Sequence, residues 1–133
     1  MKRKNRLIIS ALAIIMLSLI VIMQSPLNRQ TIPTRFIAGE NMGFDLGPGN
    51  LNFGLIVPGY SASRQITITN TQTHPTLTKI KSSGEISKYI IVSDNNFILD
   101  SGESKNITFS CYPEKGLELR EYPGKIIMTT YKA

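Results

Sequence analysis

The chain has 133 residues, enough for one domain and an anchor, and carries a formal net charge of +6. Four of its 15 basic residues lie within the first six positions, which leaves a net charge of only +2 for the rest. Those remaining basic residues are scattered among acidic ones, so the composition argues against nucleic acid as a partner. A single cysteine excludes an intrachain disulfide, and the fold must therefore be stabilised by its core alone.

The N-terminal region contains an unbroken run of apolar and small residues from Leu7 to Met23. In a helix this run spans about 25 Å, slightly less than the roughly 30 Å hydrocarbon core of a bilayer. We interpret residues 7–25 as a transmembrane helix and residues 1–6 as a cytoplasmic basic stub. A cleaved signal peptide is the alternative, although bulky Met23 stands where a cleavage site needs a small residue.

The orientation of this helix is predicted from the charges that flank it. Lys2, Arg3, Lys4 and Arg6 precede the apolar run, and no basic residue follows it immediately. Basic residues next to a membrane span favour the cytoplasmic side. We therefore expect a single-pass cell-membrane protein with a cytoplasmic N-terminus and a C-terminal domain outside the cytoplasm.

Residues 26–43 contain two prolines and few apolar residues, and we interpret them as a linker or stalk, with one strand that adheres to the domain as an alternative. From Leu51 onward, short runs with alternating apolar and polar residues are separated by turn residues, which is typical of β-strands. The clearest alternations place Ile66 and Ile68 inward in one strand, and Ile107 and Phe109 in another. The apolar positions of residues 77–81 change parity, which indicates a bulge or a bend. The pattern predicts an all-β domain over residues 44–133, a seven-stranded antiparallel sandwich.

Several motifs in this region resemble one known family. Leu51–Gly54, the turn Val57–Gly59 and the strand Ile66–Asn70 are similar to the opening of immunoglobulin-like ASH/MSP-type domains. The segments 97–109 and 122–126 are similar to that family's later strands, and the resemblance covers about Gly43 to Tyr131. It implies an immunoglobulin-like fold and a non-enzymatic interaction or structural module, and it transfers no active-site residue. The charged segment 115–120 departs from the family pattern.

The candidates for chemistry in the sequence are few. His74 is the only histidine and lies in a polar loop without ligands at metal-binding spacing. Cys111 is on the inward parity of its strand, which predicts a buried and inert thiol, with an intermolecular disulfide as the alternative. The turns 94–96 and 100–103 carry oxygen ligands, yet Asx turns explain them better than calcium. We expect no catalytic residue, no metal and no cofactor.

Two surface features are candidates for modification or binding. Asn106 begins the sequon Asn106–Ile107–Thr108 on the outward parity of a strand, so it is a candidate for glycosylation, with a chance match as the alternative. The charged loop 113–122 carries Leu117, Leu119 and Tyr122, which could contact a partner protein. In the alternative, its leucines close the end of the sandwich.

These features favour a non-enzymatic, membrane-anchored module outside the cytoplasm that binds another envelope protein or acts as a scaffold. We expect no nucleic-acid partner and no small-molecule substrate. The alternative is an accessory subunit of a membrane complex that contacts its partners through the transmembrane helix.

Overall fold

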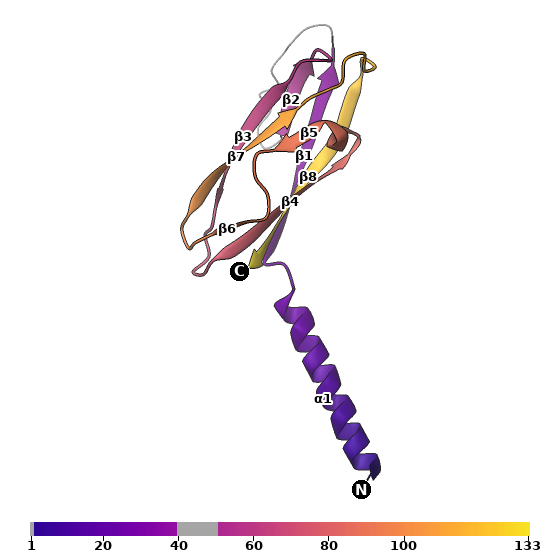
Figure 1. Ribbon diagram of the computed structural model, residues 1–133, viewed down its shortest axis with the longest axis vertical. Helices are drawn as coiled ribbons and strands as arrows, with labels where there is room; N and C mark the ends of the chain where they lie inside the picture. Colours follow the sequence, from indigo (N-terminus) through magenta and orange to yellow (C-terminus); the bar gives the residue numbers. More distant parts are fainter. Residues whose placement is uncertain (1, 40–50) are drawn as a thin grey trace.

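The computed structural model describes residues 2–39 and 51–133, in which an N-terminal helix is followed by a β domain of two sheets (Figure 1). The predicted boundary between linker and domain, at residues 43 and 44, lies outside the described residues. The elements in chain order are α1 (Lys2–Met23), β1 (Asn28–Ala38), β2 (Leu51–Ile56), β3 (Ala62–Thr69), β4 (Thr76–Gly84), the 3-10 helix η1 (Glu85–Tyr89), β5 (Ile90–Val92), β6 (Phe97–Leu99), β7 (Ser104–Cys111) and β8 (Glu121–Lys132).

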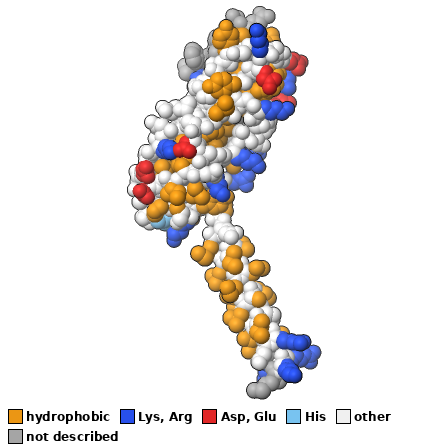
Figure 2. Space-filling model, in the orientation of Figure 1, with side chains coloured by type: hydrophobic (Ala, Val, Ile, Leu, Met, Phe, Trp, Pro, Cys, Tyr) orange, Lys and Arg blue, Asp and Glu red, His pale blue; other side chains and the backbone are white. Residues whose placement is uncertain are grey.

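Helix α1 stands clear of the β domain, and none of its described residues is buried. Its 22 residues have a mean hydropathy of 2.7 over the most apolar window, so by length and composition it could cross a membrane, as a signal sequence also could. Figure 2 shows apolar side chains around the helix and basic ones at its free end. The hydroxyls of Ser10 and Ser18 donate to the carbonyls of Leu7 and Ile15, which satisfies them within the helix.

The larger sheet has the strand order β2-β1-β8-β4-β6, and the smaller one the order β3-β7-β5. Strands β1 and β2 run parallel, whereas the other pairs are antiparallel, so the larger sheet is mixed. The prediction of a β-rich domain of two sheets is confirmed. The predicted count of seven strands and the purely antiparallel pairing are wrong, because the described residues contain eight strands and one parallel pair.

The additional strand is β1, which occupies most of the segment predicted as a linker. It pairs with β8 from Asn28 opposite Thr130 to Ile37 opposite Glu121. In its second half the side chains of alternate residues are buried, namely Ile32, Thr34, Phe36 and Ala38. The prolines concealed this alternation, but a proline is tolerated in an edge segment where its missing N–H is not needed.

Several local predictions are confirmed. The N–H of Tyr60 donates to the carbonyl of Val57 at 3.0 Å, and Gly59 has a φ of +95°, as a type II turn requires. Strands β3 and β7 alternate as expected. The predicted bulge at residues 77–81 is wrong, because β4 pairs with β8 without a register shift. Thr76 and Thr78 take the inward positions, and Leu77 faces outward.

The interior is most apolar in the half of the domain away from α1. Phe36 and Tyr122 stack there with ring centroids 4.8 Å apart, and Tyr89 meets both rings edge-on. Helix η1, which the sequence analysis did not predict, contributes the fully buried Ile86. Space for this side chain depends on Gly124, where an added Cβ would lie 2.4 Å from a methyl carbon of Ile86.

Candidate functional site

The two sheets leave one side of the sandwich open in the half nearest α1. Strand β1 pairs with β8 throughout, but with β2 only from Thr34 onward. Among the described residues, the outer edge of residues 28–33 therefore has no partner strand. Strand β3 pairs only with β7 among the described strands. We call the opening between β1 residues 28–33 and β3 residues 66–69 the open side.

The backbone groups on both edges of the open side are oriented by the neighbouring hydrogen bonds. The N–H of Ala38 donates to the carbonyl of Arg120, the residue opposite it in the pairing of β1 with β8. The even-numbered residues of β1 therefore direct their backbone N–H and C=O groups toward β8. The alternation of antiparallel strands then turns the N–H and C=O of Arg29 and Thr31 toward the opening. After β3, the N–H of Asn70 donates to the carbonyl of Glu103. By the same alternation, the backbone N–H and C=O groups of Thr67 and Thr69 point toward the opening.

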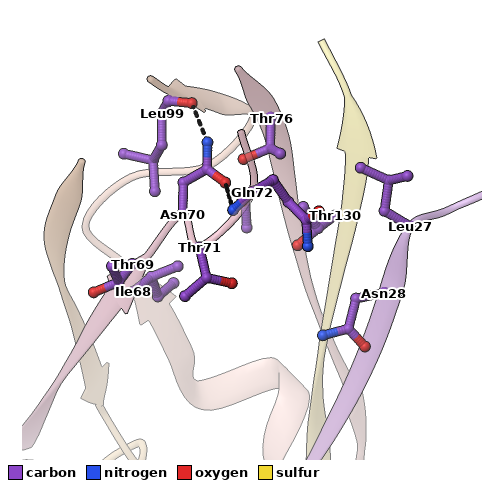
Figure 3. A pocket seen from close by; sticks show the side chains of 11 residues that line it. Leu27, Asn28, Ile68, Thr69, Asn70, Thr71, Gln72, Thr76, Leu99 and Thr130 are labelled. Carbon is purple, nitrogen blue, oxygen red and sulfur yellow. Dashed lines mark hydrogen bonds between the residues drawn. The ribbon is translucent and has the colours of Figure 1, made fainter. Parts of the chain in front are cut away.

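A groove runs into the open side between the two sheets. Its volume is about 240 Å³, with Ile32 and Met128 on the larger sheet facing Ile66 and Ile68 on β3. A second hollow of about 70 Å³ continues from it toward α1 (Figure 3). The residues common to both are Asn28, Ile68, Thr69, Thr78 and Thr130. Both walls of the lining therefore combine apolar side chains with hydroxyl groups, and the larger sheet adds amide groups.

The end of the groove is built around Asn70, whose side chain is 4% exposed. Its amide nitrogen donates to the carbonyl of His74 at 2.9 Å and to that of Leu99 at 3.0 Å, with Asp100 at 3.1 Å. Its side-chain oxygen accepts from the N–H of Gln72 at 2.9 Å (Figure 3). This one residue joins two loops. The sequence signal was only an asparagine at a strand end before a polar loop.

The predicted contact residues of the loop 113–122 are separated by the structure. Leu119 is 52% exposed, whereas Leu117 is half-buried against the core. Tyr122 is only 4% exposed, and its hydroxyl donates to the carbonyl of Glu118 at 2.8 Å. Tyr122 is therefore a core residue and offers no contact surface. The signal that was missed is its place on the inward parity of the long final strand.

The charge of this loop is engaged in local interactions. The guanidinium of Arg120 lies 2.7 Å from the carboxylate of Glu85, 3.5 Å from that of Glu118 and 4.0 Å from the ring centroid of Tyr122. The hydrogen bond to Glu85 raises the pKa of Arg120, and burial raises the pKa of Tyr122. These contacts attach the loop to η1.

Asn106 lies on the outer face of β7 and is exposed. Its side-chain oxygen accepts a hydrogen bond from the hydroxyl of Thr67 at 2.7 Å. The exposure agrees with the outward parity on which the glycosylation candidate was based. The site is on the smaller sheet, and it remains a prediction.

His74 and Cys111 lie in the settings that the sequence indicated. His74 is half-buried in its loop, and its Nδ1 is 3.1 Å from the carbonyl of Pro75. Cys111 is fully buried, and burial raises the pKa of its thiol to about 12. A thiol with so high a pKa is scarcely ionised at neutral pH and is a poor nucleophile.

The two turns weighed as calcium ligands use their oxygens within the fold. Asp100 donates its N–H to the carboxylate of Glu103 at 2.8 Å, which closes that turn. Asp94 forms an ion pair with Lys105, and this hydrogen bond lowers the pKa of Asp94. In the part of the chain that the structure describes, no group of three or more His, Cys, Asp or Glu could hold a metal ion.

No family model, no curated protein and no solved structure matches the chain. The structure accordingly defines the class as an N-terminal apolar helix followed by a β-rich domain of two sheets. The resemblance to ASH/MSP-type domains receives no support from these comparisons, and no family is identified.

Proposed function

We propose that this protein is a non-enzymatic binding module, anchored in the cell membrane, that holds a partner protein of the cell envelope beside the membrane. The β domain has the immunoglobulin-like sandwich that the sequence resemblance implies, and it lies outside the cytoplasm. Its partner contributes an extended segment that adds as a strand at the open side.

The observation that carries this proposal is the pair of strand edges, on either side of a groove, that pair with no strand in the described ranges 2–39 and 51–133. Main-chain groups on such an edge give a peptide its affinity, and side-chain pockets between the sheets give selectivity. Ile66 and Ile68 supply an apolar wall for alternate side chains of the added strand. The charge of Arg29 and the ring of Pro33 on the β1 edge limit indiscriminate strand pairing, as in other soluble sheets.

The position of the open side restricts the partner to the membrane surface. Strand β1 begins after only residues 24–27, a connection that spans at most about 14 Å when extended. A partner segment that pairs with residues 28–33 must therefore approach the bilayer closely. The segment next to a transmembrane helix of a second protein meets this condition.

A second copy of this chain is a poor occupant of the same edge. Strand β1 leads away from α1 along the length of the molecule (Figure 1). Antiparallel pairing of two β1 edges needs a two-fold axis perpendicular to the strands. That axis would place the two anchors at opposite ends, which is incompatible with one membrane.

The test compares Thr31→Pro with Thr31→Val in the full chain. Proline removes the N–H that faces the opening, whereas valine preserves it and the strand propensity. We expect a protein that co-purifies with the unaltered chain to be lost with Thr31→Pro and retained with Thr31→Val, while circular dichroism shows both variants folded. Equal retention by folded variants would contradict strand addition.

The alternative function is that of an accessory subunit that contacts its partners through α1. It is favoured by the exposure of every described residue of this helix, which leaves all of its faces available for other helices. Replacing α1 by an unrelated transmembrane helix distinguishes the two functions. Retained partners favour the β domain, whereas lost partners favour the helix. Substrate turnover that required His74 would contradict both functions.

The orientation is proposed from the basic residues before the apolar run. Protease added to intact cells should remove the β domain and leave the N-terminal stub protected. Protection of the β domain would contradict this topology.

A further inference from the structure

The fold gathers basic residues that are scattered in the sequence onto one surface. Arg29 on β1, Lys79 and Lys81 on β4, and Lys125 on β8 are all exposed. Each alternates with buried neighbours or pairs in register with an outward-facing residue, so all four lie on the outer face of the larger sheet. We call this surface the basic face.

The strand registers order this face in rows from the α1 end. The first row is apolar, with Tyr131 opposite Leu77 and Leu77 opposite Ile98. The second row contains Arg29, Thr129 and Lys79. The third contains Thr31, Ile127 and Lys81. Successive rows are about 7 Å apart, since a strand rises about 3.3 Å per residue.

The cations of the basic face have no acidic partner among the described residues, unlike three cations elsewhere on the domain. Arg35, Lys105 and Arg120 each lie within 4.0 Å of a carboxylate. No ion pair involves Arg29, Lys79, Lys81 or Lys125 in the described part of the chain. Lys79 instead lies over the ring of Tyr131, with its Nζ 5.4 Å from the centroid.

We propose that the α1 end of the basic face docks onto the bilayer that holds the anchor, with the apolar row in the headgroup region and the next row against lipid phosphates. Ile98 is 60% exposed and provides the apolar contact. Tyr131 has the amphipathic ring that favours a membrane interface. Arg29 and Lys79 then face anionic lipid, and each basic residue near such a surface contributes about 1 kcal/mol.

The order of the rows and the place of the anchor identify the bilayer as the occupant. The apolar row lies at the end where α1 joins the domain, as Figure 1 shows for β6 and the start of β4. Leu27 at the end of the connection donates its N–H to the carbonyl of Thr130, which fixes β8 next to the anchor. The inference rests on the membrane anchoring in the proposed function and goes beyond it, because it concerns the outer face of the larger sheet and needs no partner protein.

The chain contains no tryptophan, so a single substitution gives a unique fluorescent probe. The probe variant is Ile98→Trp, and it has two controls. Ile91→Trp tests an isoleucine of equal exposure, 60%, on β5 of the smaller sheet. Ser104→Trp tests an exposed position on the outer face of β7, near the same end of the domain as Ile98.

The full chain would be reconstituted in vesicles of phosphatidylcholine, with or without phosphatidylglycerol, containing brominated lipid as quencher. We expect quenching in Ile98→Trp at least about twofold greater than in the controls, and only in anionic vesicles at low salt, where the Debye length exceeds about 8 Å. Arg29→Gln combined with Lys79→Gln should abolish the difference. Equal quenching in all three variants would overturn the proposal. So would quenching in Ile98→Trp that is independent of lipid charge and salt concentration.

Discussion

The two halves of the β domain differ in the side chains that fill the space between the two sheets. The half away from α1 is closed by Phe36, Tyr122 and Ile86, all buried and apolar or aromatic. The half next to α1 has Thr78 and Thr130 on its inward face, and Asn70 at its end. We call these the far half and the near half.

The comparison shows where this fold concentrates its stability and where it leaves surface available. In the far half, β2 covers the edge of β1 and η1 adds a fully buried side chain. In the near half, no described strand covers that edge, and polar groups line the space between the sheets. A polar, uncovered interior can accept an added strand, whereas a dry aromatic one cannot open without loss of core contacts.

The largest effect is expected from Phe36→Ala in the far half. The ring is fully buried and stacks on Tyr122, so its removal leaves a cavity. We expect the free energy of unfolding to fall by about 3–5 kcal/mol, measured by urea denaturation of the full chain in detergent. Leu55→Ala is the control, since Leu55 on neighbouring β2 is 37% exposed, and it should change stability little. Similar losses for both would refute the assignment of the far half as the stability centre.

The next effect is expected from Asn70→Ala in the near half. The substitution leaves the buried carbonyl of Leu99 and the part-buried carbonyl of His74 without this donor. We expect a loss of about 2–3 kcal/mol in the free energy of unfolding, because an unsatisfied buried group costs about 1–3 kcal/mol. Gln72→Ala is the control. Gln72 contacts Asn70 through its backbone N–H, and its side chain is exposed, so removing that side chain should have little effect. An unchanged stability in Asn70→Ala would show that water replaces the amide.

The strands with clean alternation, β3 and β7, were predictable from sequence, whereas β4 and the far-half residues Phe36, Tyr122 and Ile86 were not. Alternation identified Ile107, Phe109 and Cys111 correctly as buried, because apolar residues at every second position of a strand all lie on the same face of the sheet. In β4 the same rule failed, since Thr78 is inward and Leu77 outward. A threonine can be buried when its face of the sheet is polar, and that depends on residues distant in sequence.

The candidate site could not be predicted because its parts are ordinary residues brought together by register. Strand β1 was hidden by Pro33, and the open side exists only through the partial overlap of β1 with β2. The basic face likewise arises because β4 and β8 pair in a register that brings Lys79 and Arg29 into one row. Tyr122 was misread because a charged loop next to it suggested exposure.

A third and smaller effect should appear only at alkaline pH. Burial raises the pKa of Cys111 to about 12, whereas an unfolded thiol ionises near a pKa of about 8.5. The contribution to stability is complete below the unfolded pKa and is lost as pH rises toward the folded one. The free energy of unfolding should therefore decline above about pH 8.5, and less steeply in Cys111→Ala. Native protein should also resist maleimide labelling at neutral pH until the far half unfolds; rapid labelling would contradict its closure.

The smallest effect is expected from the ion pair between Asp94 and Lys105 at the surface of the near half. The hydrogen bond from Lys105 lowers the pKa of Asp94, so its contribution to stability is present above the unfolded pKa of about 3.9 and is lost as pH falls through the lower folded value. Asp94→Asn should flatten the acid limb of the stability profile, and Lys105→Gln should flatten it less, because the N–H of Asn95 still donates to Asp94. Both should change stability little at neutral pH, because both partners are exposed to solvent. The measurement is urea denaturation from neutral pH down to strongly acidic pH. An acid limb that Lys105→Gln leaves unchanged would show that Lys105 acts mainly through the ring of Phe97, 5.0 Å from its Nζ, and not through the carboxylate.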